Sequence, residues 1–95
     1  MLTISNAASE AIHTMLRVPG VPPEGGVRVQ YAPDHQRLSV FLASEPMVGD
    51  LKYDAGDGAF LYVAAEVAER IHGKTFDARR NGTGRTQFVL HRASH

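Results

Sequence analysis

The chain has 95 residues, which suits one compact domain and leaves no room for two independent cores, so we expect a single domain over residues 1–95. Its 43% hydrophobic and 21% charged residues are typical of a globular protein and exclude intrinsic disorder. It contains no cysteine, which excludes disulfides, thiolate nucleophiles, zinc ribbons and cysteine-ligated iron–sulfur clusters within this chain.

The formal net charge is zero, but the charges are unevenly distributed. Up to Glu69 there are four basic and nine acidic residues, whereas from Arg70 onward there are six basic residues and one acidic residue. Such asymmetry can mark an anionic partner, or it can draw together two parts of one fold or two copies of the chain. We favour attraction within the fold or between copies.

The first predicted element is an amphipathic helix over residues 7–17. Ala8, Ile12, Met15 and Leu16 recur at helical spacing, and Ser5 or Asn6 can cap the free N–H groups of the first turn. The pattern before this helix has neither the basic start nor the long apolar run of a secretory signal, and no stretch is long enough to span a bilayer. We therefore expect a cytoplasmic protein without a membrane partner.

Alternation of period two follows the connector at residues 18–26 and predicts a β-rich body. The predicted strands cover residues 27–31, 38–43, 51–53, 59–63, 74–78 and 86–91, with a short helix over 65–71. The most apolar strand, 59–63, should be central. We expect an α+β fold in which the first helix packs on a mostly antiparallel sheet with one short inserted helix. The predicted core comprises Ile12, Leu16, Val27, Val29, Leu38, Val40, Leu61, Val63, Phe76 and Phe88.

Two glycine-rich segments could carry chemistry. Residues 54–58 resemble an acidic calcium loop, but the ligand spacing and the closing Glu are missing, so a hairpin turn is favoured. Residues 81–85 could cradle a phosphate with backbone N–H groups, but no helix follows them, and Asn-Gly is typical of tight hairpins. We interpret this segment as a hairpin turn as well.

Arg79, Arg80 and Arg85 form the concentrated basic feature of the sequence and are the candidate anion-binding residues. They are accompanied by little aromatic interleaving and by no nucleic-acid-binding motif, so nucleic acid is not an expected partner. Solvated strand faces are the favoured interpretation, with a small anionic ligand as the alternative.

No residue pattern indicates catalysis. The serines lack a nucleophile-elbow context, and no element places two carboxylates as an acid/base pair. Asp34 and His35 in a turn could bind a metal weakly, together with the terminal histidines His91 and His95. Ordinary surface histidines are favoured, so we expect no catalytic residue, no metal ligand and no cofactor.

The order of elements resembles the HesB/IscA family of A-type iron–sulfur carriers over about residues 2–90. Residues 2–8 resemble the family's opening strand-to-helix segment, and residues 26–29 its first hairpin strand. Ser44-Glu45-Pro46 followed by Gly49-Asp50 resembles the loop after the second strand. Residues 58–63 and 72–78 resemble the central strand and the glycine-led strand that follows the short helix. The resemblance implies an α+β fold of this type.

The family holds iron or a cluster through one cysteine in the loop between the hairpin strands and a pair near the C-terminus. The corresponding segments here, residues 32–37 and 90–95, contain no cysteine. No ligand can therefore be carried over, and cluster carriage does not follow from the resemblance. The first hypothesis is a non-enzymatic interaction or regulatory protein linked to iron–sulfur cluster assembly, with another protein or a second copy as partner. The alternatives are a small anionic-ligand or nucleic-acid binding module that uses Arg79, Arg80 and Arg85, and a weak histidine-based metal binder.

Overall fold

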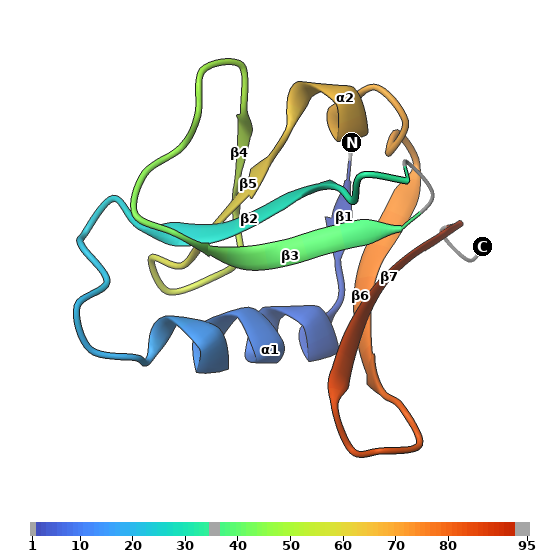
Figure 1. Cartoon of the computed structure of the whole chain (residues 1–95), viewed down its shortest axis with the longest axis horizontal. Helices are drawn as coiled ribbons and strands as arrows, with labels where there is room; N and C mark the ends of the chain where they lie inside the picture. The colour runs from blue at the N-terminus through green and yellow to red at the C-terminus, as the bar shows by residue number, and fades with distance from the viewer. Residues whose placement is uncertain (1, 35–36, 93–95) are drawn as a thin grey trace.

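The computed structural model describes residues 2–34 and 37–92, which form two helices and two sheets (Figure 1). The elements in chain order are β1 Thr3–Ile4, α1 Asn6–Leu16, β2 Gly26–Tyr31, β3 Leu38–Ala43, β4 Leu51–Asp54, β5 Phe60–Val63, α2 Ala65–Ala68, β6 Lys74–Arg80 and β7 Thr86–Arg92. The α+β class predicted from the periodicity is confirmed.

The larger sheet has the strand order β3-β2-β5-β4. β2 pairs antiparallel with β3 and parallel with β5, and β4 pairs antiparallel with β5. β5 is therefore an inner strand, as its apolar sequence predicts. Val27 lies opposite Leu61, and Val29 lies opposite Val63. Because side chains alternate along a strand, these four residues share one face of the sheet, and all four are buried.

The second sheet has the order β1-β6-β7 and was not anticipated as a separate unit. β6 and β7 form a long antiparallel hairpin, while the two-residue β1 pairs parallel with β6 through Ile4 and Phe76. Figure 1 shows the hairpin turn projecting beyond α1. The rings of Phe76 and Phe88 stack with centroids 5.1 Å apart, which ties the two strands together on the side of the core.

Helix α1 begins where Ser5 caps it. The Ser5 hydroxyl accepts a hydrogen bond from the backbone N–H of Ala8 at 3.0 Å, which satisfies one of the free donors of the first turn. Ala8 and Ile12 lie four residues apart and are fully buried against the sheets. Figure 1 shows α1 lying below the larger sheet and beside the β6–β7 hairpin.

The predicted core is largely confirmed. Ile12, Val27, Val29, Leu61, Val63 and Phe76 are buried. The other four predicted members, Leu16, Leu38, Val40 and Phe88, are half-buried and pack against the buried cluster. The inserted helix was predicted over residues 65–71 but ends at Ala68. β6 runs two residues beyond the predicted strand, to Arg80. Among the described residues, no helix is long and apolar enough to cross a membrane.

Candidate functional site

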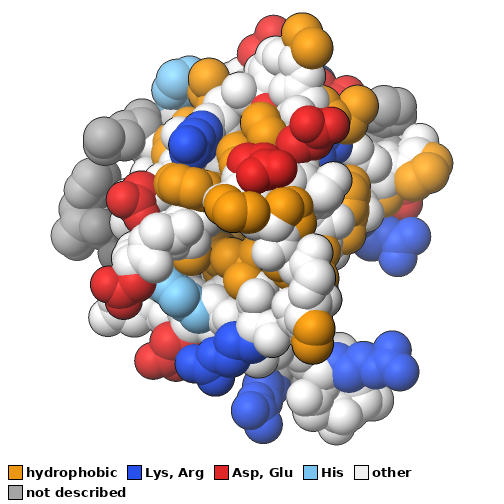
Figure 2. All heavy atoms as spheres, turned by 90° about the vertical axis from the view of Figure 1, so that its left-hand side faces the viewer, with side chains coloured by type: hydrophobic (Ala, Val, Ile, Leu, Met, Phe, Trp, Pro, Cys, Tyr) orange, Lys and Arg blue, Asp and Glu red, His pale blue; other side chains and the backbone are white. Residues whose placement is uncertain are grey.

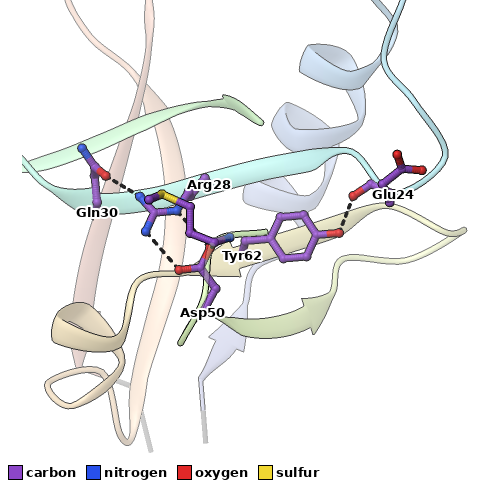
Figure 3. A network of polar contacts seen from close by, with 6 residues as sticks. Glu24, Arg28, Gln30, Asp50 and Tyr62 are labelled. Carbon is purple, nitrogen blue, oxygen red and sulfur yellow. Dashed lines mark hydrogen bonds and ion pairs between the residues drawn. The ribbon is translucent and has the colours of Figure 1, made fainter. Parts of the chain in front are cut away.

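The face of the larger sheet that is turned away from the core carries a row of mostly polar residues, two of which are buried. Arg28 of β2 lies opposite Phe41 of β3 and Tyr62 of β5, and Tyr62 lies opposite Lys52 of β4. This row faces away from the four core valine and leucine side chains. Arg28 and Tyr62 are nevertheless buried, with the Asp50 carboxylate bonded to one and the Glu24 carbonyl to the other (Figure 3).

Arg28 and Asp50 form a buried, two-pronged ion pair. The Nε of Arg28 donates to Oδ2 of Asp50, and Nη2 donates to Oδ1, both at 3.0 Å. Only 7% of the Arg28 side chain and 1% of the Asp50 side chain are exposed. Nη1 of Arg28 donates to Oε1 of Gln30, so the guanidinium is bonded on both sides. The planar guanidinium matches the carboxylate, which is the geometry needed to offset the loss of water from both charges.

Burial works to raise the pKa of Asp50, but the hydrogen bonds from Arg28 and from the Met47 N–H outweigh it and hold the pKa below its ordinary value. Asp50 therefore stays charged under all ordinary conditions. A charge that is both buried and paired acts as a fixed anchor, because moving either partner into water separates two desolvated ions.

The anchored segment is the loop between β3 and β4, residues 44–50, which we call the Met47 loop. The Met47 N–H donates to Oδ2 of Asp50 at 2.9 Å, and the Asp50 N–H donates to the Met47 carbonyl at 3.0 Å. Gly49 has a φ of 89°, a conformation that other residues rarely adopt. The same carboxylate thus closes the turn and binds the sheet.

The tip of this loop presents apolar side chains to solvent. Met47 is 60% exposed and Val48 is 106% exposed, and Leu51 and Phe41 beside the loop are also exposed. Figure 1 shows this loop rising above the larger sheet, and Figure 2 shows acidic side chains and separate hydrophobic side chains at the upper end of the molecule. An apolar tip on a loop fixed by a buried ion pair is an arrangement suited to contact with another protein.

Tyr62 fixes the connector before β2 to the same face. Its hydroxyl donates to the Glu24 carbonyl at 2.5 Å, and burial, followed by the charge of Glu24, raises the pKa of the phenol. Gly26 lies between them. A Cβ at this position would lie 2.6 Å from the Phe60 carbonyl and 2.9 Å from the Tyr62 ring, so only glycine allows this close approach.

The hairpin interpretation of both glycine-rich segments is confirmed. In the turn between β4 and β5, the Asp54 carboxylate accepts from the Gly56 N–H at 2.7 Å. In the turn between β6 and β7, the Asn81 side-chain oxygen accepts from the N–H groups of Thr83 and Arg85, and the Asn81 carbonyl accepts from Gly84. These N–H groups are therefore already used, which argues against a phosphate cradle.

The three candidate arginines lie on the same hairpin but are not equivalent. Arg79 and Arg80 end β6, and both line a groove of about 390 Å³ against α1. Arg85 follows the Asn81 turn and is exposed outside that groove. The structure thus brings together two of the three residues.

The proposed histidine-based metal site is not assembled by the described residues. The Asp34 carboxylate lies 3.2 Å from Nη2 of Arg37, while His35 and His95 lie outside the described residues. Within residues 2–34 and 37–92, no group of three or more metal-ligating side chains is found. His13 has an unforeseen role, because its two ring nitrogens lie 2.7 Å from the Ser9 carbonyl and 2.9 Å from the Gly56 carbonyl, which joins α1 to the β4–β5 turn.

His91 takes part in a polar chain that runs across the second sheet. Its Nε2 lies 3.0 Å from Oδ2 of Asp77, and Oδ1 of Asp77 accepts from the Ser5 hydroxyl at 2.5 Å. The Ser5 bond, then the His91 bond and the Ala78 N–H, lower the pKa of Asp77 to about 2. The hydrogen bond to Asp77 raises the pKa of His91. A serine nucleophile needs the imidazole beside its hydroxyl, but here the Asp77 carboxylate lies between Ser5 and His91. The three residues therefore do not form a catalytic triad.

This chain predicts a pH dependence of stability. The lowered pKa of Asp77 adds stability above its unfolded value of 3.8, which is lost as the pH falls through about 2. The raised pKa of His91 adds stability below its unfolded value of 6.5, which is lost as the pH rises through the folded value. The free energy of unfolding of the parent, relative to that of His91→Gln, should therefore be largest between pH 3.8 and 6.5. Urea denaturation across this range measures the difference, and a flat difference would show that the pair is not formed.

The buried ion pair was missed in the sequence. The available signal was the position of Arg28 among the alternating residues of a predicted strand, on the face opposite Val27 and Val29. That signal indicates only a polar face, which is normally solvated. The acidic partner is 22 residues away in a loop, so no local spacing connects the two.

Comparison with known proteins places this fold. No family model matches the chain, and no curated protein matches it by sequence. Solved structures do match. The crystal structure of Escherichia coli SufA, involved in biosynthesis of iron–sulfur clusters, is 30% identical with a TM-score of 0.72, covering 96% of this chain and 84% of SufA. The structure of IscA with a [2Fe-2S] cluster is 26% identical with a TM-score of 0.66, covering 97% and 85%.

The similarity therefore extends over nearly all of this chain and over most of each solved structure. It confirms the resemblance found in residues 2–90. This sequence has no cysteine at any position, which sets it apart from the cysteine-containing family pattern described above. The chain belongs to the HesB/IscA family, whose fold is related to iron–sulfur cluster assembly, and is a member without cysteine.

Proposed function

We propose that this protein is a non-enzymatic interaction or regulatory protein that contacts a component of iron–sulfur cluster assembly instead of carrying a cluster itself. The observation that carries the proposal is the exposed apolar tip, Met47 and Val48, on a loop held by the buried Arg28–Asp50 pair. The similarity to SufA and IscA supports the link to cluster assembly. The lack of cysteine supports the loss of carriage.

The chemistry of the tip supports a protein partner. Met is flexible and polarisable and is over-represented at binding surfaces. Covering exposed apolar side chains with a partner removes them from water, which makes the free energy of binding more favourable. The Asp50 anchor reduces the number of loop conformations in the free protein, so binding has less conformational entropy to overcome. A fixed loop backbone with an adaptable Met47 side chain therefore favours contact with another protein.

The experiment is an affinity purification of native complexes with mass spectrometry, comparing the parent with the double variant Met47→Ser/Val48→Ser. We expect cluster-assembly components to be enriched by the parent and lost with the double variant. Val18→Ser is the matched control, because Val18 is an exposed apolar residue, 47% accessible, outside the Met47 loop. Equal recovery of the same partners by the parent and the double variant would refute the role of the loop.

The protein purified anaerobically from cells is expected to be colourless and to carry no stoichiometric iron or sulfide. Cluster irons are normally held by cysteine thiolates, and none exists in this sequence. Absorption spectroscopy with iron and sulfide analysis makes the test. A visible absorption band with matching iron and sulfide content would contradict the prediction.

A small-anion-binding function is the second candidate. It is favoured by one observation, that both Arg79 and Arg80 line the groove beside α1. Arg85, the third arginine predicted from the sequence, does not line the groove. The residues to test for anion binding are therefore Arg79 and Arg80.

A further inference from the structure

A groove runs between helix α1 and the β6–β7 hairpin, on a face separate from the Met47 loop. We call it the α1–hairpin groove. Its volume is about 390 Å³, within the usual range for small-molecule sites. It exists because the facing residues are small: Ala7 and Ala11 lie one turn apart on α1, and Ala78 lies on β6. Larger residues at these positions would let the helix and the hairpin fill the space.

The floor of the groove is apolar and rigid. Ala78 and Phe88 lie opposite one another in the β6–β7 register and so share a face of the sheet. Phe88 stacks on the buried Phe76, which fixes its ring. Met15 lines the groove from α1. A ligand that occupies this floor must therefore offer an apolar body of its own.

One end of the groove is cationic. Arg80 pairs in register with Thr86, next to the Ala78–Phe88 pair on the same face of the hairpin. No ion pair or side-chain hydrogen bond engages Arg80 among residues 2–34 and 37–92. Arg79 also lines the groove, but it precedes Arg80 directly and so belongs to the other face of the strand. Its charge works to lower the pKa of His91. Arg80 is thus the cation placed to meet a ligand in the groove.

The opposite wall limits the charge of that ligand. Glu10 and Thr14 line the groove from α1, one turn apart. A carboxylate on this wall repels a second negative charge, so a polyanion is disfavoured. The Thr14 hydroxyl donates to the Glu10 carbonyl at 3.0 Å and leaves its oxygen lone pairs to accept. A guanidinium, an apolar floor and an acidic far wall together select a monoanion with an apolar tail.

We propose that the α1–hairpin groove binds a small monocarboxylate with an apolar tail, whose carboxylate pairs with Arg80 and whose tail lies on Ala78 and Phe88. Figure 2 shows basic side chains gathered at the lower end of the molecule, the end at which α1 and the hairpin turn lie in Figure 1. Arginine matches a carboxylate better than a point charge does, because the guanidinium can donate two parallel hydrogen bonds.

The test is an amide chemical-shift titration of the full chain with three probes: octanoate, octanol and inorganic phosphate. We expect octanoate to saturate and to shift the amides of Ala11, Ala78 and Phe88. Octanol lacks the charge and phosphate lacks the tail, so both should bind at least about tenfold more weakly. Saturable phosphate binding as tight as that of octanoate would show a plain anion site and overturn the proposal.

Two substitutions locate the binding. Arg80→Gln removes one exposed charge and should weaken octanoate about tenfold or more, whereas Arg85→Gln, the same change outside the groove, should leave the affinity unchanged. Ala11→Leu should fill the groove and remove binding. The Met47→Ser/Val48→Ser variant should bind octanoate normally, so this test is independent of the proposed protein contact. Equal affinity of the parent and Arg80→Gln, or shifts confined to residues outside the groove, would refute the proposal.

Discussion

Replacing Asp50 with Ala is expected to lower the free energy of unfolding by about 3–5 kcal/mol. The loss is large because Arg28 would remain buried, 7% exposed, without the carboxylate that offsets its desolvation. The substitution also removes the acceptor for the Met47 N–H, which frees the Met47 loop. Urea denaturation followed by circular dichroism measures the change.

The matched control is Asp34→Ala. Asp34 also pairs with an arginine, Arg37, at 3.2 Å, but water reaches both side chains, which are 41% and 82% exposed. Exposed pairs contribute about 0–1 kcal/mol, so this loss should be small. The double variant Arg28→Met/Asp50→Leu removes both charges and should recover most of the stability lost in Asp50→Ala. If Asp50→Ala and Asp34→Ala cost the same, the Arg28–Asp50 pair is not buried in solution.

Leu61→Ala is the second substitution with a large expected effect, a loss of about 2–5 kcal/mol. Leu61 is 0% exposed and lies on β5 opposite Val27 of β2 and Tyr53 of β4. Neighbours on both sides belong to the same sheet and cannot move inward independently, so the shortened side chain leaves a cavity. Chemical denaturation again measures the loss.

Leu51→Ala removes the same atoms from the edge strand β4, where Leu51 is 47% exposed. Its cost should be well below that of Leu61→Ala, because water already reaches the side chain. A cost under about 0.5 kcal/mol for Leu61→Ala, against the 2–5 kcal/mol of a buried leucine, would place Leu61 at the surface and remove β5 from the centre of the sheet.

The elements that the sequence predicted well are those with a local signal. Alternation placed β2 and β3 within one residue at each end, and the Ser5 cap with Ala8 and Ile12 placed α1. Both patterns arise from residues that are close in sequence and that share one buried face. The Asn81 turn was predictable for the same reason, since its side chain bonds to backbone groups two and four residues ahead.

What the sequence could not predict depends on contacts between distant residues. A two-residue strand such as β1 has no period, so only the family resemblance of residues 2–8 indicated it, and it forms because β6 offers an edge to pair with. The candidate surfaces have the same origin. Asp50 reaches Arg28 only when the Met47 loop folds over the sheet, and Arg80 meets α1 only when the hairpin lies beside it. The charged residues were visible in the sequence, but their partners were not.

The pairing of β1 with β6 also bears on how the chain reaches this structure. The Ser5–Asp77 hydrogen bond joins residues 72 positions apart, and the cap of α1 sits at this junction. During synthesis, the first helix is made long before the strand that holds its capping residue. Isolated helices of its length are marginal in water. The β1–β6 pairing and the Ser5–Asp77 bond can therefore form only after most of the chain has been translated, and long-range contacts of this kind slow folding.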